Sequence, residues 1–218
     1  PIIPDNEANA AAYAEYLVGK GAAYRNFVYV SIAEGIGAGI MIDRDLFRGK
    51  NKRAGEFGHF KVSDSRIRCN CGRYGCWELF ASKRALMKDR PAGQSEEAYL
   101  NALFSAYDQR EPEAVARVET YVRYLFAGLD MVLLSVDPTA IILGGDLGEY
   151  MERCIQIGKG VLHLEKTFYG YENVPIIASG VRGNGTLQGA ALLPLEQILN
   201  ERPNRRNLFR ETPPVENA

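Results

Sequence analysis

The sequence is poor in histidine, cysteine and tryptophan: its 218 residues include two His, four Cys and one Trp. It also lacks a charge excess, because 26 Lys and Arg residues nearly balance 27 Asp and Glu residues and leave a net charge of −1. Binding to DNA or to an acidic membrane surface draws on clustered basic side chains. With basic residues spread through most of the sequence, we expect neither contact from this chain.

Long hydrophobic runs are also missing. No apolar stretch reaches the roughly 18 residues of a membrane-spanning helix, and no secretory leader is evident. We therefore expect a soluble, cytoplasmic protein whose cysteines stay reduced. The chain begins at Pro1 without a methionine, which suggests a fragment or a processed chain. Its 24.2 kDa and 46% hydrophobic residues suit one lobe or at most two small ones.

The scarce metal-ligating residues gather in residues 54–78, around which we expect the chain to be organised. One His and three of the four Cys lie there with the spacing His-x9-Cys-x-Cys-x4-Cys, as His59, Cys69, Cys71 and Cys76. Four such donors are what a closed, tetrahedral structural zinc site requires. A disulfide or inert buried thiols are the alternatives, and a nucleic-acid zinc finger fits less well because no second His lies nearby. The spacing predicts structural zinc.

Carboxylates accompany this cluster. Glu56 and His59 are three positions apart, so one helical turn would point both side chains the same way. Such a pair suits the paired hydroxyls of a sugar, because charge-assisted hydrogen bonds are short and directional. Glu78 follows Cys76 by two residues. The alternatives are a solvated surface acid for Glu56 and a first-turn helix acid for Glu78.

Residues 55–59 (GEFGH) and 69–78 (CNCGRYGCWE) together resemble the signature of the ROK family of repressors, open reading frames and sugar kinases. The resemblance runs from Asn6 to about Ala191. It implies an α/β fold, the carboxy-terminal lobe of an actin-like (ribonuclease-H-like) ATPase, here with a zinc-binding loop. The amino-terminal lobe and any DNA-binding domain are expected to be absent. The resemblance assigns sugar hydroxyls to four residues, Asn6, Glu56, His59 and Glu78.

Two positions depart from the pattern of the family's kinases. Those kinases carry Asn-Asp where this chain has Asn6-Glu7, and their Asp removes a proton from the sugar. An added methylene shifts the carboxylate by about an ångström, which can cost on the order of a hundredfold in proton transfer. The matching phosphate loop reads Gly-Thr-Gly in the kinases but contains Glu34 here, which would repel a phosphate. Plain helix capping by Asn6 and close strand packing at the glycines are the simpler alternatives.

These features favour a sugar-sensing effector domain of a ROK transcriptional repressor of the xylose- or glucose-responsive kind. It would bind a monosaccharide and zinc, contact DNA only through the absent domain, and form a homodimer or higher homo-oligomer. Glu7 and Glu34 argue against enzymatic activity. The alternative is a fragment of an ATP-dependent, glucokinase-like sugar kinase.

Hydrophobic periodicity and cap residues predict the regular elements. The lobe should span residues 1–200 and be followed by a disordered tail at 201–218, whose arginines could contact an anionic partner. Strands are expected at 27–32, 36–42, 139–143 and 174–178. Helices are expected at 7–18, 77–88, 95–107, 111–134, 150–164 and 186–199.

Overall fold

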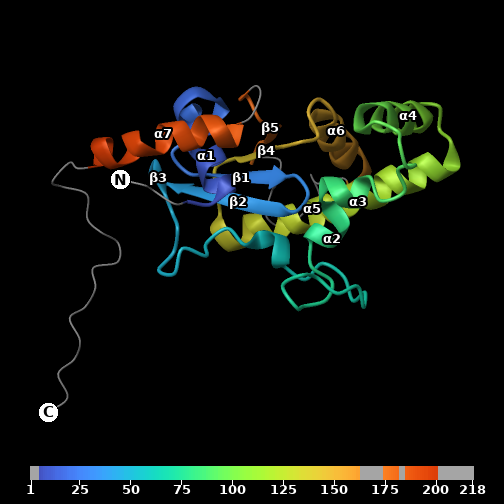
Figure 1. Cartoon of the computed structure of the whole chain (residues 1–218), viewed down its shortest axis with the longest axis horizontal. Helices are drawn as coiled ribbons and strands as arrows, with labels where there is room; N and C mark the ends of the chain where they lie inside the picture. Colours follow the sequence, from blue (N-terminus) through green and yellow to red (C-terminus); the bar gives the residue numbers. More distant parts are fainter. Residues whose placement is uncertain (1–4, 163–173, 182–184, 201–218) are drawn as a thin grey trace, which may run out of the picture.

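A five-stranded mixed sheet forms the centre of the protein (Figure 1). The structure is a computed structural model that describes residues 5–162, 174–181 and 185–200. The strand order is β3-β2-β1-β4-β5. The strands are β1 (Phe27–Ile32), β2 (Ile36–Ile42), β3 (Asp45–Leu46), β4 (Ile141–Gly145) and β5 (Ile176–Ala178). β1 pairs antiparallel with β2 and parallel with β4, so the sheet combines a hairpin with a crossover, as an α/β lobe requires.

Helices cover both faces of the sheet (Figure 1). The α-helices are α1 (Glu7–Val18), α2 (Glu78–Ala81), α3 (Lys83–Leu86), α4 (Glu96–Asp108), α5 (Pro112–Val136), α6 (Tyr150–Leu162) and α7 (Gly185–Asn200). Two short 3-10 helices, η1 (Lys20–Ala23) and η2 (Phe57–His59), complete the described elements. Among the described residues, no helix is both long and apolar enough to cross a bilayer.

Alternate residues of β1 enter two separate cores, as the period of two in a strand dictates. Val28 and Val30 belong to the larger core, which includes the apolar face of α5. Phe27 and Tyr29 belong to a smaller core against α1. β1 is therefore covered on both faces, which explains its nearly continuous apolar sequence.

Helix α1 packs closely on the sheet because its core-facing residues are mostly alanine. At Gly39 on β2, a Cβ atom would collide with the Ala12 side chain and the Ala8 carbonyl. The helix starts at an N-cap in which the Asn6 side-chain oxygen accepts a 2.7 Å hydrogen bond from the Ala8 N–H. This packing fixes the N-terminus of α1 beside the ends of β1 and β2.

Most elements lie where the sequence predicts them, and the bounds of α1, β1 and β2 agree fully with the prediction. The predicted helix at 77–88 is instead two short helices, because Ser82 adopts an extended conformation and caps α3 through the Ala85 N–H. Pro175 precedes β5, the edge strand of the sheet, as expected. The predicted tail at 201–218 lies outside the described residues.

Candidate functional site

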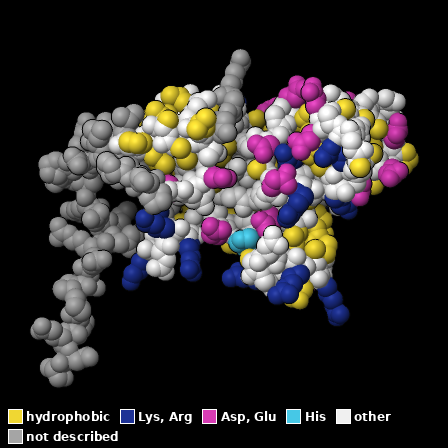
Figure 2. Space-filling view, viewed as in Figure 1, with side chains coloured by type: hydrophobic (Ala, Val, Ile, Leu, Met, Phe, Trp, Pro, Cys, Tyr) yellow, Lys and Arg dark blue, Asp and Glu magenta, His cyan; other side chains and the backbone are white. Residues whose placement is uncertain are grey.

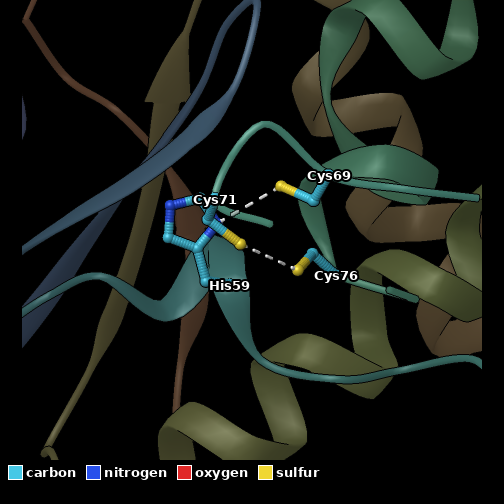
Figure 3. A group of neighbouring side chains, drawn as sticks. All are labelled: His59, Cys69, Cys71 and Cys76. Carbon is cyan, nitrogen blue, oxygen red and sulfur yellow. Dashed lines mark hydrogen bonds between the residues drawn. The ribbon is translucent and has the colours of Figure 1, made fainter. Parts of the chain in front are cut away.

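The four predicted metal ligands converge in the loop between η2 and α2. The ligand atoms of His59, Cys69, Cys71 and Cys76 all lie within 4.8 Å of one another. Figure 3 shows them gathered around a common centre. The Cys69 sulfur is 3.7 Å from His59 Nδ1, and the Cys71 and Cys76 sulfurs are 3.6 Å apart.

These separations fit a tetrahedral zinc ion. Zn–S bonds of about 2.3 Å at tetrahedral angles place two sulfurs about 3.8 Å apart, and a Zn–N bond of about 2.0 Å shortens the S···N separation slightly. Two of the six ligand-atom pairs, at 3.6 and 3.7 Å, are close to that geometry, and all six lie within 4.8 Å. The soft donor set also suits zinc better than a hard, oxygen-preferring cation.

The thiols of the cluster differ in their environment. Burial, together with the hydrogen bond to Glu78, raises the pKa of Cys69 to about 12. Cys71 is exposed, and a hydrogen bond from the Arg73 backbone lowers its pKa. A metal must therefore displace a proton from Cys69, so metal binding releases acid.

Turns and one tryptophan hold this loop in place. Gly75 has a φ of 72°, and a Cβ atom there would collide with the Ser63 carbonyl oxygen. The next residues return to the core, where the Trp77 side chain is fully buried and its indole N–H donates to the Tyr124 carbonyl at 2.9 Å. The indole packs where Gly128 of α5 leaves room for it. Cys76 is thereby attached to the longest helix of the protein.

A cavity of about 440 Å³ opens beside the cysteine cluster. It brings together the side chains that the sequence singled out from three distant segments. Its lining includes Asn6, Glu7, Glu56, His59 and Glu78. The first two come from the start of α1, the next two from the η2 segment and the last from the start of α2.

His59 connects the cavity to the cluster. Its Nδ1 lies 3.7 Å from the Cys69 sulfur, and its Nε2 lies 3.8 Å from a Glu56 carboxylate oxygen. Nδ1 therefore faces the Cys69 sulfur, whereas Nε2 faces the Glu56 carboxylate in the cavity. Glu78 also contacts both the cysteine cluster and the cavity. Its Oε1 is 2.9 Å from the Cys69 sulfur, and the residue lines the cavity.

Asp5 was not among the residues singled out from the sequence, yet it also lines the cavity. The carboxylate lies 2.7 Å from an Arg48 nitrogen and accepts a 2.7 Å hydrogen bond from Asn9. Burial alone would raise the pKa of Asp5, but the hydrogen bonds from Asn9 and Arg48 outweigh it, so the pKa is lowered. No sequence motif linked Asp5 to Arg48, which lies far along the chain.

A second cavity, of about 690 Å³, lies next to the first at the carboxyl ends of β1 and β4. Gly144, Gly145 and Asp146 line it, together with the residues that follow β5. Glu7, Ser31 and Ala33 line both cavities, so the Glu7 side chain stands at their boundary.

Glu34 is not among the residues that line either cavity. Its side chain is 70% exposed, and one oxygen lies 3.6 Å from the Lys83 ammonium. Lys83 is itself buried and also lies within ion-pair distance of Glu96 and Asp146. Because three carboxylates share this one cation, it offsets the charge of Glu34 only in part, and the repulsion between Glu34 and a bound phosphate stays a prediction.

Comparison with known proteins finds both regulators and kinases. The xylose repressor of Bacillus subtilis is 35% identical over 149 residues, covering 68% of this chain and 38% of the repressor. A ROK family glucokinase from Streptomyces griseus, solved with glucose and AMPPNP, is 30% identical with a TM-score of 0.73, covering 88% of this chain and 68% of the glucokinase. A ROK family transcriptional regulator, a homologue of the Escherichia coli MLC protein, is 28% identical with a TM-score of 0.66, covering 88% of this chain and 51% of the regulator.

The fold is therefore the mixed α/β fold shared by ROK sugar kinases and ROK regulators. The family model described as ROK family matches residues 1–197, and the chain belongs to the ROK family. It spans well under half the length of the Bacillus repressor.

Proposed function

We propose that the chain is the sugar-sensing domain of a ROK-family transcriptional regulator, and that a monosaccharide binds in the smaller cavity. The observation that carries this proposal is the convergence of Asn6, Glu56, His59 and Glu78 on one cavity. An amide, an imidazole and two carboxylates provide donors and acceptors for several hydroxyl groups at once. The similarity to a xylose repressor and to a regulator structure supports the regulatory role.

Zinc has an indirect part in this function. Three cysteines and His59 Nδ1 would complete its coordination and leave no open position for catalysis. The ion would fix the imidazole ring with Nε2 toward the cavity. It would also fix Cys76, and with it Glu78 at the start of α2. The metal therefore orders sugar-binding groups without contacting the sugar.

The charge of the cavity narrows the class of sugar. The described lining contains Asp5, Glu7, Glu56 and Glu78 but no Lys or Arg. A phosphorylated sugar would place its negative charge among these carboxylates without a cation to compensate it. The ligand is therefore a sugar without a phosphate group.

Calorimetric titration tests the proposal. The zinc-loaded protein is titrated with xylose, glucose, other aldohexoses and N-acetylmannosamine, and with glucose 6-phosphate as the charged control. At least one neutral sugar should bind, and glucose 6-phosphate should not. Preferential binding of the phosphorylated sugar, or of no sugar in the series, would contradict the proposal.

A sugar kinase is the second candidate, and the position of Glu7 favours it. Glu7 lines both cavities, so its carboxylate would stand between a sugar in the smaller cavity and a nucleotide in the larger one. A general base must occupy such a place. Glu34 lies outside both cavities and 3.6 Å from the Lys83 ammonium, which weakens one of the two sequence arguments against this activity.

A coupled phosphoryl-transfer assay with ATP separates the two functions. The regulator proposal predicts sugar binding without turnover. Glu7→Asp restores the carboxylate length found in the family's kinases, and Glu7→Gln removes the base. Turnover by the unchanged protein that Glu7→Gln abolishes would establish the kinase and contradict the regulator proposal.

A further inference from the structure

The charges of the chain are strongly segregated, although they nearly cancel overall. Residues 46–75 contain eight Lys and Arg residues but two Asp and Glu residues. The other 188 residues contain 18 Lys and Arg residues and 25 Asp and Glu residues. This distribution differs from the even spread expected from the overall charge. One stretch of thirty residues is thus strongly basic within an otherwise acidic protein.

The basic side chains of this stretch are exposed on two loops. Figure 2 shows Lys and Arg side chains along the lower edge of the molecule, on both sides of the single visible histidine, whereas acidic side chains gather over α4 and α6. The loop after β3 and the cysteine-rich loop supply them. The exposed members are Lys50, Lys52, Arg53, Lys61, Arg66, Arg68 and Arg73.

These cations have few acidic neighbours. Within the described part of the chain, Lys61 is the only one of the seven with a carboxylate in ion-pair range, Asp64 at 2.6 Å. Protein surfaces usually intersperse charges of both signs, and a field of one sign steers oppositely charged partners. Six basic side chains on two loops of the lower edge are therefore available to an anionic partner (Figure 2).

We propose that this surface, the basic loop surface formed by the seven residues above, binds the phosphate backbone of duplex DNA. The proposal goes beyond sugar binding and is independent of it. All seven residues are lysines or arginines, the side chains that most often contact phosphate oxygens. The charges are also distributed over two loops, as contacts to an extended backbone require.

The metal cluster gives this surface its shape. Arg66 and Arg68 lie before Cys69, and Arg73 lies between Cys71 and Cys76. The backbone hydrogen bond from the Cys69 N–H to the Arg73 carbonyl, 2.8 Å, closes the turn between them. A metal-held turn loses less conformational freedom on binding than a flexible one.

Two exposed apolar side chains distinguish a protein partner from DNA. Ile67 is 54% exposed and Tyr74 is 53% exposed, both within the basic loop surface. An acidic protein partner would use such side chains as anchors. A phosphate backbone would not need them.

The test measures fluorescence anisotropy of a labelled 20-base-pair duplex of mixed sequence with the zinc-loaded chain from about 30 to 200 mM NaCl. The unchanged protein should bind at low salt with a dissociation constant in the micromolar range, and the logarithm of its affinity should fall linearly with the logarithm of salt concentration. Two triple variants each remove three charges: Arg66→Gln/Arg68→Gln/Arg73→Gln, and Lys50→Gln/Lys52→Gln/Arg53→Gln. Each should weaken binding about tenfold or more at 50 mM salt and reduce the salt slope by about 2 to 3.

Matched controls separate the specific surface from net charge. Arg84→Gln/Lys88→Gln/Arg123→Gln removes three exposed charges from α3, its following turn and α5, and should change affinity less than about threefold. Ile67→Ser/Tyr74→Ser should leave DNA affinity unchanged. The Lys50/Lys52/Arg53 triple lies outside the loop of the metal ligands. Its effect on DNA affinity can therefore be interpreted even if the Arg66/Arg68/Arg73 triple lowers the zinc content.

Three results would overturn the proposal. The first is that the unchanged protein does not bind the duplex at 50 mM salt. The second is that the control triple variant loses as much DNA affinity as the two test triples. The third is salt-sensitive self-association in sedimentation that Ile67→Ser/Tyr74→Ser abolishes, which would assign the surface to an acidic protein face.

Discussion

The sheet core and the cysteine-rich loop at residues 54–78 achieve order by different means. In the core, β1, β4 and the apolar face of α5 bury long aliphatic side chains, and the hydrophobic effect is enough to fix them. The loop has only η2, two isolated β-bridges and turns formed by glycine. Beyond these turns and the Trp77 anchor, we propose that its order depends on a metal held by four side-chain donors. The core should therefore survive metal removal, whereas the loop should not.

The largest effect is expected at Trp77, which joins the two regions. Trp77→Ala would empty a fully buried site and should lower the free energy of unfolding by about 3 to 5 kcal/mol, as measured by urea denaturation. Ile67→Ala, on the exposed face of the loop, should change it by less than about 0.5 kcal/mol. Equal effects of the two changes would mean that Trp77 does not anchor the loop to the core.

Removal of one ligand should affect the loop alone. Cys69→Ser should lower the zinc content well below one ion per chain in the presence of a competing chelator, because a soft thiolate ligand is replaced by a weaker hydroxyl. Elemental analysis gives the zinc content. In excess chelator the variant and the unchanged protein should unfold within about 1 kcal/mol of each other, because both then lack the metal.

Cys154 of α6 is the matched control, since it is a buried cysteine of the larger core. Cys154→Ala should keep full zinc content and destabilise the protein by about 1 kcal/mol. Full zinc retention by Cys69→Ser would refute the proposed ligand set.

A smaller effect is expected at the cavity wall. Glu56→Gln should weaken binding of the preferred sugar on the order of tenfold, because a neutral amide makes a weaker hydrogen bond to a hydroxyl than a carboxylate does. Calorimetry measures the affinity, and zinc content should stay unchanged. Glu34→Gln, a change outside both cavities, serves as control, and a similar loss there would show that the effect is not local.

The smallest effect concerns thiol reactivity. In the zinc-loaded protein all four thiols should react slowly with a maleimide. After chelation Cys71 should react first, since it is exposed and its pKa is lowered by the Arg73 backbone N–H. Cys154 should react only on unfolding, because burial raises its pKa to about 12. Counting labels by mass spectrometry checks the order, and early labelling of Cys154 would contradict it.

The sequence predicted the core well because its signals are local. The alternation and β-branching of 27–32 and the periodicity of α5 determine both element type and buried face. It also predicted the metal cluster, since the four ligands lie close together in the chain. The break at Ser82 escaped notice because helix propensity there is continuous, and only tertiary packing decides it.

The cavities could be predicted only in part. The family resemblance brought Asn6 to the same site as Glu56 and Glu78, which no spacing rule could do across so many residues. The resemblance could not show that Lys83 lies within ion-pair distance of Glu34, or that Arg48 forms an ion pair with Asp5. Both pairs depend on the tertiary fold. The effect of Glu34 on a bound phosphate stays a prediction.

The central claim is that a metal-held loop presents sugar-binding groups to the smaller cavity. It is tested most directly by measuring sugar affinity on one protein sample when zinc-loaded, after chelation, and after zinc is restored, with circular dichroism to follow the core. We predict that binding disappears on chelation and returns with zinc while the core signal stays constant. Unchanged sugar affinity in the zinc-free, folded protein would contradict the claim.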